Sequence, residues 1–265
     1  MCATCGCGAD VAPGGEHDHG DPHHRAHADH GHSHAGKSGD RTVLLEQKVL
    51  ARNDEYAAAN RAWLARHGVF AVNLMSSPGS GKTTLLQRTA AQMSGAVQIG
   101  VIEGDQETAL DAERVRAAGC RAVQLNTGSG CHLDAAMVAG ALRELQPERG
   151  SVVMIENVGN LVCPALFDLG EAVRVVLASV TEGADKPVKY PHMFRHANLV
   201  LVTKRDLLPY VDFDVARFRA DLKAVSPRAA VTELSAVTGD GMREWLDWLS
   251  CQADRAHRQP QPAQG

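Results

Sequence analysis

A glycine-rich segment at residues 76–83 carries the residue types and spacing that point most directly to chemistry. It reads Ser-Ser-Pro-Gly-Ser-Gly-Lys-Thr, follows an apolar run at residues 69–75 and opens an amphipathic run at Thr83. Glycines in such a loop let backbone N–H groups turn toward phosphates, the lysine supplies positive charge, and the following hydroxyl can hold Mg²⁺. Ser76 stands where the usual pattern begins with glycine. We predict a nucleoside triphosphate site formed by Gly79, Ser80, Gly81, Lys82, Thr83 and Thr84.

A second segment indicates which base the site takes. The apolar run at residues 197–202 ends in Thr203-Lys204-Arg205-Asp206, which is similar to the N-K-x-D element that reads guanine in GTPases. A carboxylate there can accept hydrogen bonds from guanine N1–H and from its exocyclic amine, a pair that adenine lacks. Threonine replaces asparagine at position 203, as it does in Rho-type GTPases. A later pair resembles the Ser-Ala loop that meets guanine O6, so we predict GTP or GDP bound by Thr203, Lys204, Asp206, Ser235 and Ala236.

Two acidic residues follow strand-like runs between these segments. Asp105 comes after the run at residues 97–102, and Glu156 comes after the run at residues 151–155. The carboxyl ends of such strands face the γ-phosphate and the Mg²⁺ ion in nucleotide-binding folds of this kind. Gly159 is expected to give a backbone N–H to the γ-phosphate. Either acid could orient the attacking water, or be an ordinary solvated carboxylate, so the predicted catalytic set is Lys82, Asp105 and Glu156.

The amino terminus contains two clusters of potential metal ligands. Cys2, Cys5 and Cys7 stand close together, and thiolates suit Ni²⁺, Zn²⁺ or Cu(I). A polar tract at residues 17–34 has almost no apolar residues to bury, so we expect it to be disordered and to bind nickel or zinc at many sites. A solvated spacer is the alternative. The histidines of this tract are His17, His19, His23, His24, His27, His30, His32 and His34.

A third candidate metal site lies inside the globular part of the chain. Cys131 and His132 are adjacent at the expected start of a helix over residues 133–145, and Cys163 follows Glu156 closely. From the residues alone this is a weak indication, because a lone cysteine is usually a small buried apolar residue.

Composition restricts the class of protein. We find no apolar run near the length of a membrane span and no signal-peptide core, so we expect a cytoplasmic protein with no membrane contact. Seven cysteines are expected to be reduced there, with Cys120 and Cys251 structural. The formal net charge of −4 offers no basic patch for nucleic acid.

Alternating strand-like and helix-like runs predict an α/β fold with a mainly parallel twisted sheet covered by helices on both faces. Strands are expected near residues 69, 97, 121, 151, 173, 197 and 229, and helices over residues 42–66 and near 83, 107, 132, 211 and 240. The predicted organisation is a metal-binding tail at 1–40 with a flexible hinge at 36–39, a G domain at 41–251 and a disordered tail at 252–265. The segment at 181–196 is either a nucleotide-sensing or dimer loop or a plain connector.

Taken together, the motifs resemble the HypB family of P-loop GTPases, which helps to deliver nickel to [NiFe]-hydrogenase. The resemblance covers residues 2–7 and about 40–250 and rests on the CxxCGC terminus, the histidine tract, S-S-P-G-S-G-K-T-T, E-G-D-x-x-T, G-x-x-C-H-L and E-N-V-G-N-L-V-C-P. It implies a metal site at Cys131, His132 and Cys163 and a GTP-dependent homodimer beside that site. It also implies a HypA-type partner containing zinc and then the hydrogenase large subunit.

Two alternatives remain beside this resemblance. The first is a urease-type nickel GTPase, but its metal motif is a Cys-Pro-His triplet, whereas this chain has Cys131 next to His132 and a separate Cys163. The second is a nickel store with a regulatory G domain, in which the histidine tract is the function. The sequence does not rank nickel against zinc at either site, because both ions accept cysteine and histidine ligands.

Overall fold

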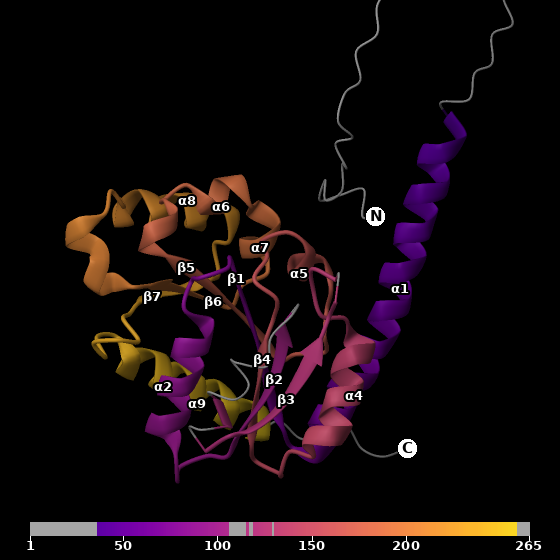
Figure 1. Ribbon diagram of the computed structural model, residues 1–265, viewed down its shortest axis with the longest axis horizontal. Coiled ribbons are helices and arrows are strands. Elements are labelled where there is room, and N and C mark those ends of the chain that lie inside the picture. Colours follow the sequence, from indigo (N-terminus) through magenta and orange to yellow (C-terminus); the bar gives the residue numbers. More distant parts are fainter. Residues whose placement is uncertain (1–35, 106–114, 117–118, 129, 259–265) are drawn as a thin grey trace, which may run out of the picture. The chain divides into compact units, whose positions relative to one another are not determined.

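The computed structural model describes residues 36–105, 115–116, 119–128 and 130–258, with side chains from residue 47 onward. The chain divides into two compact units, Met1–Val49 and Leu50–Gly265, and the geometry reported below is that of the second unit. Its described strands form one sheet (Figure 1) and are β1 (Phe70–Ser76), β2 (Ile99–Asp105), β3 (Arg121–Asn126), β4 (Val152–Glu156), β5 (Val173–Ser179), β6 (Leu199–Thr203) and β7 (Ala230–Glu233).

The sheet is parallel throughout and has the strand order β3-β2-β4-β1-β5-β6-β7. Its strands are runs of mostly apolar residues, as expected for a parallel sheet that is buried on both faces. Because all the strands run the same way, their carboxyl ends meet at one edge, and β1 ends in the middle of it. Ligands bind at such an edge in open α/β sheets. The fold class predicted from the sequence is confirmed.

The described helices alternate with the strands, and the first and the last helix differ from the predicted boundaries. The helix expected over residues 42–66 already begins at Gly36, so the predicted hinge at 36–39 is wrong. The last helix continues to Arg258, because residues 252–258 contain no proline or glycine, so the C-terminal tail predicted from residue 252 is helical over this part. The helix predicted near residue 107 lies outside the described residues. The described helices are α1 (Gly36–His67), α2 (Lys82–Met93), α4 (Ala135–Leu145), α5 (Cys163–Leu166), α6 (Lys186–Lys189), α7 (Pro191–Arg195), α8 (Val215–Val225) and α9 (Met242–Arg258), with short 3-10 turns η1 (Val180–Glu182) and η2 (Arg205–Tyr210).

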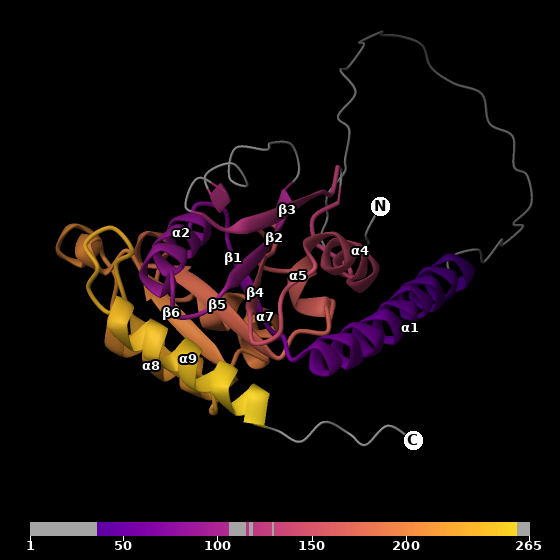
Figure 2. The same cartoon turned by 90° about the horizontal axis from the view of Figure 1, so that it is seen from below.

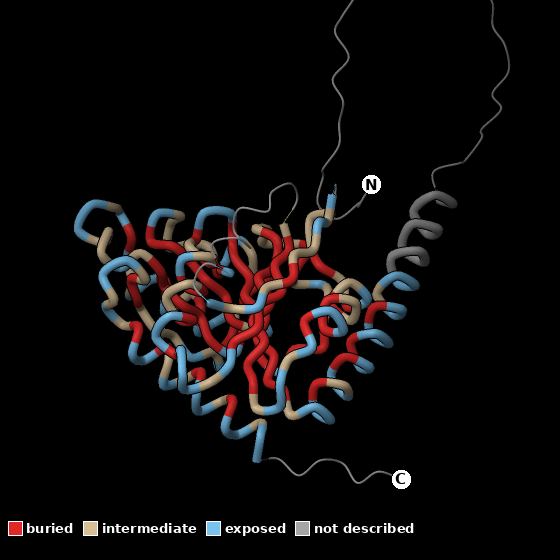
Figure 3. The backbone as a smooth tube through the Cα atoms, turned by 60° about the horizontal axis from the view of Figure 1, so that its bottom comes forward, coloured by how far each residue is buried: buried red, intermediate tan, exposed pale blue. Residues whose placement is uncertain are grey.

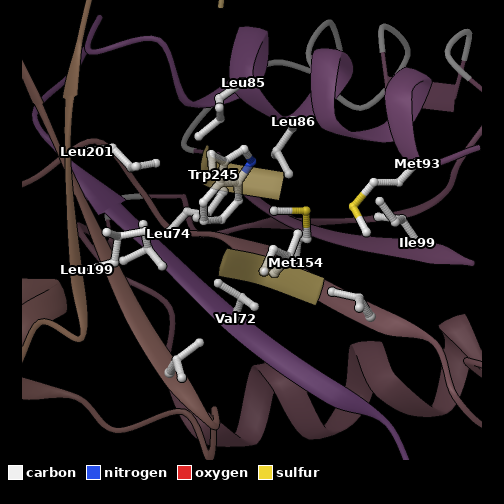
Figure 4. Close-up of a cluster of buried hydrophobic side chains, with 14 of the residues drawn as sticks. Val72, Leu74, Leu85, Leu86, Met93, Ile99, Met154, Leu199, Leu201 and Trp245 are labelled. Carbon is white, nitrogen blue, oxygen red and sulfur yellow. The ribbon is translucent and has the colours of Figure 1, made fainter. Parts of the chain in front are cut away.

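Helices α2 and α9 cover one face of the sheet. Their apolar side chains pack with those of the central strands in one cluster, in which Trp245 is fully buried beside Leu74 and Leu85 (Figure 4). The indole N–H of Trp245 donates to Thr89 Oγ1 at 2.9 Å, so α9 is fixed to the helix that follows the glycine-rich loop. In Figure 2 α9 runs beside the strands along this side.

The opposite face is covered by two groups of helices. Helix α4 and the part of α1 at residues 50–67 pack on the half of the sheet that contains β2, β3 and β4. Helices α7 and α8 pack on the half that contains β5 and β6. The strands therefore lie buried between two layers of helices, as the burial colours in Figure 3 show. None of the helices in the described part combines the length and the apolar character that a membrane span requires.

Candidate nucleotide and metal sites

The glycine-rich loop joins β1 to α2 in the order that the sequence predicts. Gly79 (φ 72°) and Gly81 (φ 95°) have left-handed backbone, which explains why glycine stands at both positions. Ser76, by contrast, is the last residue of β1, where extended backbone tolerates a side chain. Its hydroxyl accepts a hydrogen bond from Lys82 Nζ at 2.8 Å. The replacement of the first glycine by serine is therefore compatible with a phosphate-binding loop, because the serine positions the lysine.

A cavity of about 550 Å³ opens over this loop. Thr83 Oγ1 donates to Glu156 Oε1 at 2.9 Å, so the predicted hydroxyl and carboxylate meet where α2 begins and β4 ends. Asp105 lines the same cavity from the end of β2, and Gly159 lines it from the loop after β4. A hydroxyl and carboxylates are the oxygen ligands that Mg²⁺ takes in proteins. The donor set of the cavity thus fits a nucleotide with its magnesium ion.

Glu103 is a cavity residue that the sequence analysis did not single out. It is 2% exposed, lines the cavity and pairs in register with Glu156 on the neighbouring strand. In a parallel pair, residues in register point to the same face of the sheet. The sequence does contain a signal for this residue, since Glu103 is charged and directly follows an apolar run. Asp105 follows the same run two residues later, and the prediction chose Asp105 alone.

A smaller pocket of about 130 Å³ lies between the glycine-rich loop and the ends of β6 and β7. Asp206 lines it, and one of its carboxylate oxygens is buried without a hydrogen-bond partner in the described part of the chain. Thr203 Oγ1 donates to the backbone oxygen of Ser80 at 2.7 Å, so the threonine ties β6 to the loop. Ser235, Ala236 and Lys204 also line this pocket. A buried acceptor of this kind fits a base that presents N–H donors, as guanine does.

The segment after β5 also contacts the glycine-rich loop. Glu182 accepts hydrogen bonds from the hydroxyls of Ser77 at 2.7 Å and Ser80 at 2.5 Å. Lys186 donates to the same Ser77 hydroxyl at 3.2 Å and forms an ion pair with Glu182 at 3.4 Å. The segment at 181–196 is therefore more than a connector between strands. The sequence left its role open, because nothing in it links these residues to the distant serines.

Cys131, His132 and Cys163 converge although the two cysteines lie far apart in the sequence. The three ligand atoms lie within 4.8 Å of one another. Cys131 Sγ is 2.6 Å from Cys163 Sγ and 3.6 Å from His132 Nδ1. Helix α4 begins at Ala135 with Asp134 as its N-cap, so the prediction that the Cys-His pair stands at the helix start is wrong. Two thiols and an imidazole form a ligand set for Ni²⁺ or Zn²⁺.

Two features favour metal binding by His132. Its ring stacks on Phe167 with centroids 3.8 Å apart and an angle of 26° between the planes. Burial lowers the pKa of the imidazole, and the nearby Asp134 carboxylate opposes this only in part. The neutral imidazole that results is the form that coordinates a metal.

The loop after β4 belongs to both candidate sites. Asn157 Oδ1 accepts hydrogen bonds from the backbone N–H of Leu133 at 3.2 Å and of Val158 at 3.0 Å. Asn160 Oδ1 accepts from the backbone N–H of Cys163 at 3.3 Å. The loop that carries Gly159 into the nucleotide cavity is thus attached to both segments that carry the cysteines.

Comparison with known proteins identifies the family of this chain. The profile of the family "CobW/HypB/UreG, nucleotide-binding domain" matches residues 70–233. The hydrogenase maturation factor HypB of Rhizobium leguminosarum bv. viciae is 46% identical over 96% of this chain and 97% of its own length. The chain belongs to the HypB family of hydrogenase maturation factors.

Two solved HypB structures share the fold. HypB from Archaeoglobus fulgidus superimposes with a TM-score of 0.72 at 43% identity, covering 77% of this chain and 99% of that protein. HypB from Helicobacter pylori, solved in complex with nickel, gives a TM-score of 0.73 at 36% identity and covers 80% of this chain and all of that protein (100%). The family resemblance predicted from the motifs is confirmed, and the GTP-binding P-loop fold of HypB is that of this chain.

The amino-terminal ligands expected of a HypB chain lie outside the described residues. This applies to Cys2, Cys5 and Cys7 and to the histidine tract at residues 17–34. Of the predicted site residues in the described part, the structure brings those for phosphate, base and magnesium to one edge of the sheet. It gathers the three internal metal ligands beside them.

Proposed function

We propose that this chain is a GTP-hydrolysing nickel metallochaperone that binds Ni²⁺ and Zn²⁺ and delivers nickel to the large subunit of [NiFe]-hydrogenase. One observation carries the proposal: the loop after β4 takes part in both the nucleotide cavity and the thiol-imidazole cluster, through Asn157 and Gly159. The names of the relatives and the nickel complex of the Helicobacter pylori protein agree with it.

In the proposed GTPase cycle, each residue has a role that its position supports. Lys82 and the backbone of the glycine-rich loop hold the phosphates, and Asp206 selects guanine. Thr83 and Glu156 would hold Mg²⁺, which neutralises charge on the phosphates during transfer. Asp105 and Glu156 are the candidates for orienting the attacking water, because both line the cavity. Lys82 then stabilises charge on the departing phosphate oxygens.

Nucleotide state would gate the metal. We infer that GTP draws two copies into a homodimer and shifts the loop after β4, which would displace Cys163 relative to Cys131 and change the affinity for nickel. Asn157 supports this route, since its Oδ1 accepts the N–H of Val158 within the loop after β4 and the N–H of Leu133, which follows His132. The amino-terminal cysteines and histidines would collect metal, and a HypA-type partner would act between this chain and the hydrogenase, in the cytoplasm.

The test measures Ni²⁺ and Zn²⁺ affinity of the full chain, with Cys2, Cys5 and Cys7 replaced by serine, in its GDP form and with a non-hydrolysable GTP analogue. Light scattering follows the oligomeric mass in the same samples. We expect the analogue to form a dimer and to change nickel affinity in a manner lost on Cys131→Ala or Cys163→Ala. Equal affinities in the two states exclude gating, and metal bound only by the histidine tract favours the storage function instead.

Asn157→Ala tests the route of the coupling. It removes the acceptor that the N–H groups of Leu133 and Val158 share. The difference in nickel affinity between the GDP and GTP-analogue forms should therefore shrink toward zero, while the protein still binds both nucleotide and nickel. Asn198→Ala is the matched control, because that exposed asparagine also accepts a backbone N–H, from Arg174, but far from either site. If both variants keep the full difference, the coupling does not pass through Asn157.

A further inference from the structure

Helix α1 carries two asparagines on the stripe that faces the rest of the second unit. Asn53, Ala57, Asn60 and Leu64 are spaced as one face of a helix and are 6%, 1%, 3% and 4% exposed. Burying an amide costs free energy unless its hydrogen bonds are replaced. Apolar residues at these two positions would be buried at a lower cost in free energy. The hydrogen-bond partners of the two amides therefore need to be identified.

Both amides bond to the backbone of two separate segments. Asn53 Oδ1 accepts from the N–H of Ala135 at 2.9 Å, and its Nδ2 donates to the carbonyl of Asp168 at 2.8 Å. Asn60 Nδ2 donates to the carbonyls of Ala135 at 2.8 Å and Leu169 at 3.0 Å. Each asparagine therefore bridges the start of α4 and the loop at residues 168–169.

These two segments are the arms of the metal cluster. The first arm runs from Cys131 and His132 into α4, and the second runs from Cys163 through α5 to the loop that α1 holds. Phe167, which stacks on His132, immediately precedes Asp168 in the second arm. The distance between the thiol of Cys163 and the Cys-His pair thus depends on how the two arms are fixed to each other.

The contact between α1 and the second arm is close. A Cβ at Gly170 would lie 2.6 Å from the carbonyl oxygen of Ala57 and 2.6 Å from Cβ of Asn60, so only glycine fits there. Outside this contact, Arg61 Nη2 lies 2.8 and 2.7 Å from the two carboxylate oxygens of Asp168. The helix cannot rotate or slide without breaking buried hydrogen bonds.

We propose that α1 positions the internal metal site: Asn53 and Asn60 clamp its two arms and so set the separation of the ligands. The inference rests on the proposed function of Cys131, His132 and Cys163 as metal ligands. It gives the helix a second role, because α1 is also the element by which the amino-terminal segment is joined to the G domain. The asparagines contact no ligand atom and act through the backbone of the two arms, so we expect their loss to weaken metal binding toward the lower end of the range of about 10- to 100-fold that applies to groups bonded to the ligands themselves.

The experiment uses the full chain with Cys2, Cys5 and Cys7 replaced by serine, so that the charge-transfer absorption between thiolate and nickel reports the internal cluster. Ni²⁺ alone is titrated against a competing chelator in Asn53→Ala and Asn60→Ala. Asp54→Ala, an exposed neighbour on the same helix, is the matched control. We expect an affinity loss toward the lower end of the range of about 10- to 100-fold and a changed absorption band in the asparagine variants, and neither in the control.

The outcomes separate this inference from the function on which it rests. If the parent protein shows no thiolate-to-nickel band that Cys131→Ala abolishes, the proposed metal site fails first. If the band is present and both asparagine variants bind nickel within about twofold of the parent, α1 does not position the site. GDP binding checks that each variant is folded. Should Asn53→Ala not bind GDP, Asn60→Ala decides alone, since the Asn60 amide also bridges the two arms through Ala135 and Leu169.

Discussion

Exchanging Asp206 for asparagine should change the base that the protein binds from guanine to xanthine. Asp206 lines the small pocket, and one of its oxygens is buried without a hydrogen-bond partner in the described part of the chain. Removing that oxygen from water costs free energy when the protein folds, and a base with two N–H donors recovers the cost on binding. Asparagine presents an N–H in place of one acceptor, which matches the carbonyl that xanthine carries at the position of the guanine amine.

The size of the effect follows from the hydrogen bonds at stake. Asparagine keeps one acceptor, so one bond to a charged acceptor is lost, which costs about 1.5–3 kcal/mol, and the guanine amine then faces an amide donor and stays unsatisfied, at a further cost of about 1–3 kcal/mol. The sum is about 2.5–6 kcal/mol, or roughly a 10²- to 10⁴-fold weaker affinity for GDP. Affinity for the xanthine nucleotide should rise as that for GDP falls.

Equilibrium titration with fluorescent GDP and XDP measures both affinities in the parent and in Asp206→Asn. Asp212→Asn is the control, because Asp212 is exposed and does not line the pocket. A fall in GDP affinity of less than about tenfold, or an Asp206→Asn protein that still prefers GDP to XDP, would show that the buried oxygen does not read the base.

Two further substitutions test the geometry around the sites. In Gly159→Ala the new Cβ would lie 2.9 Å from Cα of Pro78, so the loop after β4 and the phosphate loop must separate. This should cost about 1–3 kcal/mol of GTP-analogue affinity in a binding titration, with a smaller loss for GDP. Asp168→Asn tests the dependence of stability on pH. Burial raises the pKa of the Asp168 carboxyl, but hydrogen bonds from Gly170 N–H and Arg61 outweigh the effect of burial and lower the pKa overall. A lowered pKa stabilises the folded state above the usual aspartate range, so urea titrations should show the variant less stable by up to about 1 kcal/mol near neutral pH. That difference should disappear as the pH falls through the folded-state pKa.

The nucleotide site was predictable because its residues stand in short contiguous motifs. The glycine loop and the Thr-Lys-x-Asp segment each carry their chemistry within a few residues, and a parallel sheet brings the carboxyl ends of its strands to one edge. Glu103 was missed for a related reason. Its neighbour Asp105 already satisfied the motif, and the in-register pairing that turns Glu103 toward Glu156 is a property of the sheet.

The metal cluster and its support depend on contacts between distant segments. The pairing of Cys131 and His132 with Cys163 came from the family resemblance, since the residues alone gave only a weak indication of a metal site and favoured a buried apolar thiol. Asn53 and Asn60 could not be predicted, because two polar residues interrupt the apolar stripe of a helix and their partners are backbone atoms of other segments. A hydrogen bond to a backbone atom does not depend on the type of the partner residue, so the sequence does not show which residue the partner is.

The shared asparagine limits how the two sites can influence each other. Asn157 Oδ1 accepts from both Leu133 and Val158, so a shift of the nucleotide loop away from the metal arm breaks one bond to a buried acceptor. The N–H that loses this bond is left without a partner, which costs about 1–3 kcal/mol when the group is buried. Coupling free energies between sites in allosteric proteins lie in the same range. Coupling is reciprocal, because the factor by which GTP changes nickel affinity must equal the factor by which nickel changes GTP affinity. If GTP weakens nickel binding, a nickel-loaded chain therefore binds GTP more weakly by the same factor, and transfer of the metal to an acceptor restores the affinity for GTP.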